Sequence, residues 1–178
     1  MVTSTLETFI DNVRESWGPL SSSLVARCHT EIEALARAPS SEGWLAQLHE
    51  DMPASKELYR DPIHGFLVLA HTEARGHAWP PHDHGRSWVI YAVQQGEMEM
   101  TTYGRMESPA GNVRLVQRET YRVMPGEGRV YLPGDIHATR CLSESVLYLR
   151  LTERELSRER EEGHMTRYIE RDGVWTTP

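Results

Sequence analysis

The chain has 178 residues, a length that suits one domain with a sizeable core, and a formal net charge of −7 at pH 7. Acidic and basic residues are interspersed, so no basic face indicates a nucleic-acid partner. No apolar stretch is long enough to span a bilayer, and no secretory leader opens the chain. Two cysteines, Cys28 and Cys141, cannot build a disulfide framework or a cysteine-based zinc site. We therefore expect a cytoplasmic protein without nucleic-acid or membrane partners. Its oligomeric state stays open, a homodimer included.

The first third of the chain predicts helices. Residues 4–7, Ser-Thr-Leu-Glu, have the spacing of a capping box and begin a helix that Gly18-Pro19 ends. A second helix is expected to begin within residues 21–23 and to end at Pro39, and a third to cover residues 41–49.

From Phe66 onward the pattern changes to short apolar or alternating runs that glycine and proline separate. The predicted strands cover residues 66–70, 87–93, 97–103, 113–123, 129–132 and 146–151. Many short strands without intervening helices indicate an antiparallel sandwich or barrel. The charge run at 153–162 indicates a solvated helix, and residues 167–175 with Asp172-Gly173 predict a hairpin. We predict a single domain with a helical amino-terminal region (1–60), a β-barrel (61–152) and a carboxyl-terminal extension (153–178).

Three histidines predict a metal site. His82 and His84 lie two residues apart, so in a strand they project from one face, whereas Asp83 points to the other face and is an unlikely ligand. His137 follows a Pro133-Gly134 turn at the start of another strand and completes a facial set. The remaining histidines receive no metal role, and Tyr91 is interpreted as a packing residue.

This arrangement resembles the cupins, jelly-roll barrels of the double-stranded β-helix type. Their first motif is His-x-His with a downstream glycine, here His82, His84 and Gly96, and their second is Pro-Gly-x-x-His, here residues 133–137. The usual cupin glutamate is missing after the histidine pair. That absence, the helical first third and the stretch 66–95 resemble the cysteine dioxygenase and mercaptopropionate dioxygenase group. The resemblance implies a mononuclear iron(II) enzyme that oxidises a small anionic thiol with O₂; zinc, nickel and manganese are alternative metals.

The chain departs from that group at three places. Val89 stands where some members have a cross-linked cysteine. Ser55 stands where the group has its carboxylate-binding arginine, so Lys56 or Arg60 could serve only with a shift. In place of the Ser-x-His-x-Tyr run are Tyr148, Arg150 and Thr152. The substrate-binding candidates are therefore Arg150, Tyr148 and Arg60, and no catalytic residue is assigned.

The orientation of Arg150 has two alternatives. Residues 146–151 alternate, so Tyr148 and Arg150 share one face and three leucines share the other. Either Arg150 points into the barrel, where it would bind the substrate carboxylate, or the leucines face inward and Arg150 lies in solvent. A metal-binding cupin of another class, such as an isomerase or a small-molecule sensor, remains the alternative function.

Overall fold

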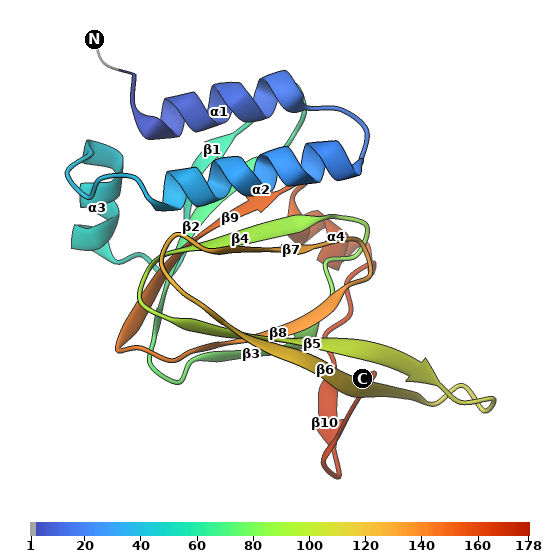
Figure 1. Ribbon diagram of the computed structural model, residues 1–178. Coiled ribbons are helices and arrows are strands. Elements are labelled where there is room, and N and C mark those ends of the chain that lie inside the picture. The colour runs from blue at the N-terminus through green and yellow to red at the C-terminus, as the bar shows by residue number, and fades with distance from the viewer. Residues whose placement is uncertain (1–2) are drawn as a thin grey trace.

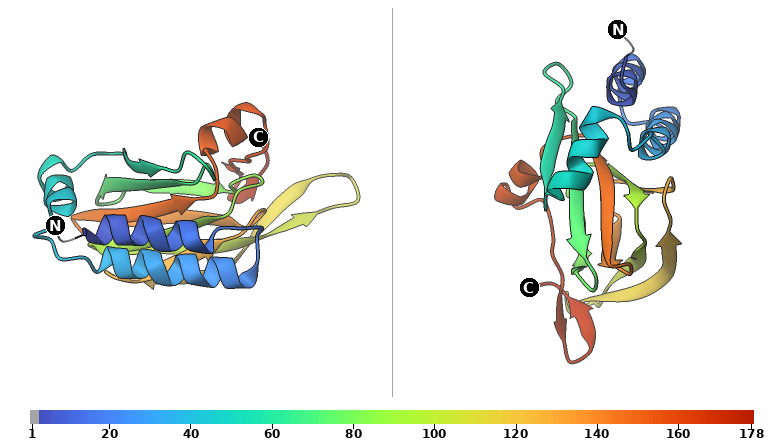
Figure 2. Two further views of the ribbon diagram at one scale, coloured as in Figure 1. Left: turned by 90° about the horizontal axis from the view of Figure 1, so that it is seen from above. Right: turned by 90° about the vertical axis from the view of Figure 1, so that its left-hand side faces the viewer.

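The amino-terminal helices cover one face of a β-sheet. The structure is a computed structural model that describes residues 3–178. Helices α1 (Thr5–Ser16) and α2 (Ser22–Ala36) lie side by side across the sheet, and α3 (Gly43–Asp51) follows at one end (Figures 1 and 2). The predicted capping box is confirmed, because the Ser4 hydroxyl accepts a hydrogen bond from the Glu7 amide and the Glu7 carboxylate accepts one from the Ser4 amide.

Two antiparallel sheets face each other and enclose the barrel (Figure 1). In spatial order the five-stranded sheet contains β1 (Lys56–Arg60), β2 (Leu67–Ala74), β9 (Ser145–Thr152), β4 (Val89–Gln95) and β7 (Gly128–Tyr131). The four-stranded sheet contains β3 (Ala78–His82), β8 (Ile136–Cys141), β5 (Met98–Glu107) and β6 (Val113–Val123). The fold is thus the predicted one, a cupin-type jelly-roll barrel preceded by a helical region.

Strand β9 is buried on both faces, and the residues that cover each face settle its orientation. Leu147, Leu149 and Leu151 belong to the apolar cluster that the helices contribute to, with Phe9 and Ile32 among its members. These leucines therefore pack outward against α1 and α2. The alternate residues of β9, Tyr148 and Arg150, line the interior of the barrel. Arg150 accordingly adopts the inward alternative, and the leucines still lie in an apolar core.

The barrel begins earlier than the predicted boundary at residue 61. β1 lies within the region predicted to be helical and pairs with β2, with Lys56 opposite Ala70 and Arg60 opposite Leu67. Asp61 makes the connecting turn, since its carboxylate accepts hydrogen bonds from the amides of Ile63 and His64. A five-residue strand with only partly buried side chains gives too weak a pattern to detect from sequence.

The carboxyl-terminal segment lies against the end of the barrel that carries the histidines. Helix α4 (Leu156–Glu161) was predicted to be solvated, but Leu156 and Glu159 are buried. The predicted hairpin is confirmed as β10 (Ile169–Arg171) and β11 (Val174–Thr176). Its turn residues, Asp172 and Gly173, both have positive φ. Among the described residues, no helix is long and apolar enough to cross a membrane.

Candidate metal centre

The three predicted histidines come together at one end of the barrel. His82 is the last residue of β3, and His137 lies opposite it in β8. His84 lies beyond the end of β3, so the pair shares no strand face, contrary to the prediction. Gly85, at φ 63°, lies in the turn that directly follows His84, in which the amide of Ser87 donates to the His84 carbonyl oxygen. Ligand nitrogens of all three residues lie within 4.8 Å of one another.

The ring nitrogens are arranged to share a cation. His82 donates its Nδ1–H to the carbonyl oxygen of Pro80 at 2.8 Å, which leaves Nε2 as the free lone pair. The Nε2 atoms of His84 and His137 face each other at 3.4 Å. Burial lowers the pKa of all three histidines, so each ring is neutral at neutral pH and offers a lone pair. Two such lone pairs facing each other in a buried site fit a divalent cation between them.

Neighbouring groups hold the ligands in place. Tyr131 stacks on the His137 ring, with centroids 3.8 Å apart and an interplanar angle of 22°. The Asp83 carboxylate accepts hydrogen bonds from the amides of Gly85 at 2.9 Å and Thr166 at 3.1 Å, so it stabilises the loop. This structural role agrees with the prediction that Asp83 is not a ligand.

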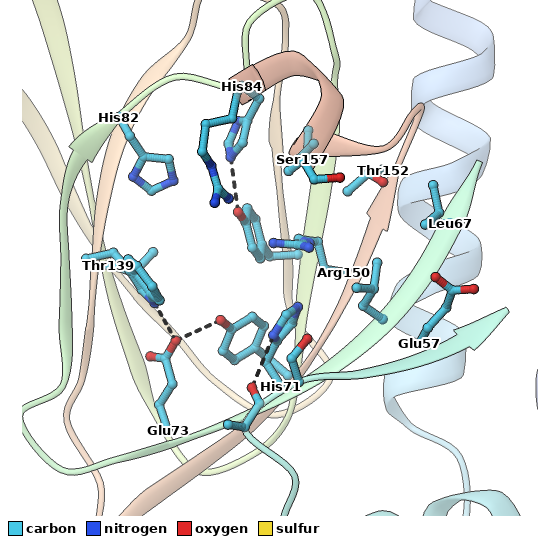
Figure 3. A pocket seen from close by; sticks show the side chains of 18 of the residues that line it. Glu57, Leu67, His71, Glu73, His82, His84, Thr139, Arg150, Thr152 and Ser157 are labelled. Carbon is cyan, nitrogen blue, oxygen red and sulfur yellow. Dashed lines mark hydrogen bonds between the residues drawn. The ribbon is translucent and has the colours of Figure 1, made fainter. Parts of the chain in front are cut away.

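A cavity of about 650 Å³ leads from the histidines into the barrel (Figure 3). His82 and His84 lie at one end of the cavity, and Glu73 lies at the other (Figure 3). Arg150 lies between these ends (Figure 3), and Tyr148, another of the predicted substrate-binding residues, also lines the cavity. Most of its lining residues are polar or charged, which suits a small polar ligand more than an apolar one.

Arg60, the third predicted substrate-binding residue, lies at the rim. Its guanidinium pairs with the carboxylates of Glu57 at 2.7 Å and Glu155 at 2.9 Å. Because two carboxylates already bind this guanidinium, it is a weaker candidate for a substrate anion than Arg150. The Nε atom of Arg150 is buried and has no hydrogen-bond partner among the described residues.

Sequence reasoning missed the role of Tyr91. Its hydroxyl lies 3.1 Å from Nε2 of His84, and the residue is opposite Arg150 in the pairing of β4 with β9. Burial raises the pKa of Tyr91, and the charge of Arg150 opposes that rise, so the phenol stays protonated and can donate a hydrogen bond at the metal centre. The signal that could have revealed it is register, since an inward Arg150 places its cross-strand partner inward as well.

Two further cavity residues, His71 and Glu73, were not predicted. They lie two apart in β2, so both point inward, and each is buried. Burial and the charge of Arg150 lower the pKa of His71 to about 3, and its ring stacks on Tyr148. Burial and the Glu73 carboxylate raise the pKa of Tyr148. Both residues lie beyond the predicted strand 66–70, because β2 continues to Ala74; their spacing of two directly after that run was the available signal.

Comparisons with known proteins find similarity in solved structures alone: no family model and no curated protein matches the chain. KdgF from Halomonas sp. is 23% identical, with a TM-score of 0.44 over 55% of this chain and 74% of that one. The cupin domain of Cnp3 from Schizosaccharomyces pombe is 12% identical, with a TM-score of 0.45 over 62% and 66%. A cupin superfamily protein from Desulfitobacterium hafniense is 15% identical, with a TM-score of 0.43 over 57% and 76%.

The sheet topology and the grouped histidines define the class of molecule. The chain forms a cupin-type barrel, and its three-histidine group could bind a metal ion. Imidazole ligands suit iron, zinc, nickel and copper alike, so the donor set fits a transition metal without selecting one.

Proposed function

We propose that the protein is a mononuclear non-haem iron dioxygenase that oxidises a small anionic thiol with O₂. The observation that carries the proposal is a ligand group of three neutral histidines without a carboxylate. Neutral ligands leave a bound divalent cation with its full double charge, and burial strengthens its attraction for an anion. A thiolate is a suitable anion for such a centre.

Arg150 supplies the second reason for an anionic substrate. A partly buried guanidinium is costly unless an anion compensates its charge, and its planar fork suits a carboxylate through two parallel hydrogen bonds. Arg150 lies opposite Tyr91, whose hydroxyl is next to His84. A compact mercapto acid can therefore place its sulfur at the metal centre and its carboxylate on Arg150.

The proposed reaction balances without a further reductant. Iron(II) held by His82, His84 and His137 would supply the centre at which thiolate and O₂ meet. Both oxygen atoms of O₂ become bonded to sulfur, so the thiolate becomes a sulfinate. Sulfur loses four electrons and O₂ gains four. In this scheme Arg150 orients the substrate, and the Tyr91 hydroxyl donates a hydrogen bond beside the metal.

Oxygen uptake by the iron-loaded protein tests the proposal. We expect consumption of one O₂ per thiol with at least one of cysteine, cysteamine, 3-mercaptopropionate and mercaptosuccinate, together with formation of the sulfinate. Zinc-loaded protein and the His84→Ala variant serve as controls and should consume none. Absence of uptake with all four thiols at full iron loading would exclude the thiol reaction.

Metal analysis addresses the alternative function. Because imidazole does not discriminate among these metals, the metal bound after purification from cells separates the classes. Stoichiometric iron favours the dioxygenase. Stoichiometric zinc or nickel, together with no oxygen uptake, favours a non-redox metalloenzyme or a sensor.

A further inference from the structure

The cavity continues past Arg150 to a second polar region around Glu73 (Figure 3). Glu73 is only 8% exposed. Its Oε1 atom accepts hydrogen bonds from the Tyr148 hydroxyl and from Nε1 of Trp79, both at 2.8 Å. Its Oε2 atom is buried and has no partner among the described residues. A structural role, in which Glu73 links the two sheets through Trp79 and Tyr148, accounts for the hydrogen bonds of Oε1 but not for the buried Oε2.

The other polar atoms here can also accept hydrogen bonds, although the Thr139 hydroxyl can donate one as well. The His71 Nδ1 atom lies 3.3 Å from the carbonyl oxygen of Ala54, so the ring proton is on Nδ1 and Nε2 is an acceptor. That Nε2 atom and the Thr139 hydroxyl are buried without partners in the part of the chain that the structure describes. Buried acceptors without donors are costly, and together they favour a ligand that brings N–H groups.

Among the charged side chains that line the cavity, Arg150 and Glu73 differ in what they can bind. Arg150 offers only donors and suits an anion, whereas Glu73 and His71 offer acceptors and suit a cation. Arg160 and Arg167 also line the cavity, and the Arg167 guanidinium lies over the Trp79 ring, 5.1 Å from its centroid. Arg60, Glu57 and Glu155 at the rim are already engaged with one another through ion pairs. The cavity thus has a metal centre, an anion-binding residue and a cation-binding residue, in that order along its length (Figure 3).

We propose that Glu73, with His71 and Thr139, binds an ammonium group of the substrate at the end of the cavity away from the metal. This inference rests on the proposed function and specifies its substrate class: an amino acid-like mercapto acid whose amino group points away from the metal. The sulfur binds at the histidines, the carboxylate binds Arg150, and the ammonium binds Glu73 through charge-assisted hydrogen bonds.

Matched ligand pairs test the proposal by calorimetry on zinc-loaded protein, which binds without turnover. The pairs are cysteine with 3-mercaptopropionate and homocysteine with 4-mercaptobutyrate, and the members of each pair differ only in the amino group. We expect the amino-bearing member to bind at least about tenfold more tightly in one or both pairs. Equal affinities within both pairs would overturn the proposal.

Two variants locate the effect. Glu73→Gln keeps the shape and an acceptor for Tyr148 and Trp79, so it should fold and abolish the preference. Glu57→Gln removes the same charge from the rim of the cavity and should keep the preference. Zinc content and thermal melting report folding; if Glu73→Gln is unfolded, Glu73→Asp retracts the carboxylate and should reduce the preference. If folded Glu73→Gln still prefers the amino-bearing thiols, the assignment of Glu73 is also overturned.

The outcome is separable from that of the proposed reaction. Tight binding of the amino-bearing thiols without oxygen uptake by iron-loaded protein would leave the ammonium site in place and remove the dioxygenase function. Oxygen uptake together with equal affinities within both pairs would support the dioxygenase function and remove the ammonium site.

Discussion

Replacing Arg150 with lysine tests how the cavity recognises an anion. Lysine keeps the positive charge but loses the planar fork, so one of two parallel hydrogen bonds to a carboxylate is lost. A hydrogen bond to a charged group is worth about 1.5–3 kcal/mol, and 1.4 kcal/mol corresponds to a tenfold change in affinity. We therefore expect Arg150→Lys to weaken 3-mercaptopropionate about 10- to 100-fold.

The assay compares two thiols on zinc-loaded protein. Cysteamine has no carboxylate, so its dissociation constant should stay the same in Arg150→Lys while that of 3-mercaptopropionate rises. Arg60→Lys is the matched control, because that side chain is 44% exposed and already pairs with two glutamates. It should change neither constant by more than about twofold. Equal losses for both thiols, or wild-type affinity for 3-mercaptopropionate in Arg150→Lys, would refute the role of the guanidinium.

Three further predictions concern the metal, pH and the turn after His84. His84→Ala should lose most of its bound metal, measured by elemental analysis, and should keep wild-type circular dichroism because the apolar core is unchanged; equal metal content would contradict the assignment. His71 stays neutral in the folded state down to a pKa of about 3, whereas the unfolded chain binds its proton near 6.5. The free energy of unfolding of the metal-free protein should therefore fall as the pH is lowered from about 6.5 toward 3, by about 1.4 kcal/mol per pH unit from this residue. Urea unfolding at several pH values measures this dependence, and in His71→Gln the free energy of unfolding should fall less steeply with pH. Gly85→Ala should destabilise the fold by about 1–3 kcal/mol, since φ is +63° and the new Cβ would lie 2.7 Å from Glu159 Oε2; unchanged urea unfolding would disprove this.

The three-histidine group could be predicted because its signal is local. His82 and His84 lie in one short motif, and His137 follows a Pro-Gly turn. The barrel was predictable for the same reason, since alternation and turn residues mark most of its strands. The predicted geometry of the histidine pair was still wrong, because β3 ends at His82 and His84 lies in the loop that follows.

The orientation of Arg150 could not be predicted because it depends on what covers the other face of the sheet. Alternation in β9 separates its leucines from Tyr148 and Arg150, but both faces of this strand are buried. Only the docking of α1 and α2 on the outer face makes the leucine side the outer one (Figure 2). The inward positions of Tyr91 and Glu73 follow from the same long-range packing.

The hydrogen bonds between the carboxyl-terminal segment and the ligand loop impose an order on how the site is assembled. The amide of Tyr168 donates to the carbonyl oxygen of Pro81, and the amide of Thr166 donates to Asp83, so both neighbours of His82 are held by residues that follow His137 in the chain. Synthesis of the three ligands alone is therefore insufficient to fix their geometry. In a chain made from its amino terminus, all three histidines emerge before the segment that holds their loop, and the loop reaches its native geometry after that segment has folded back.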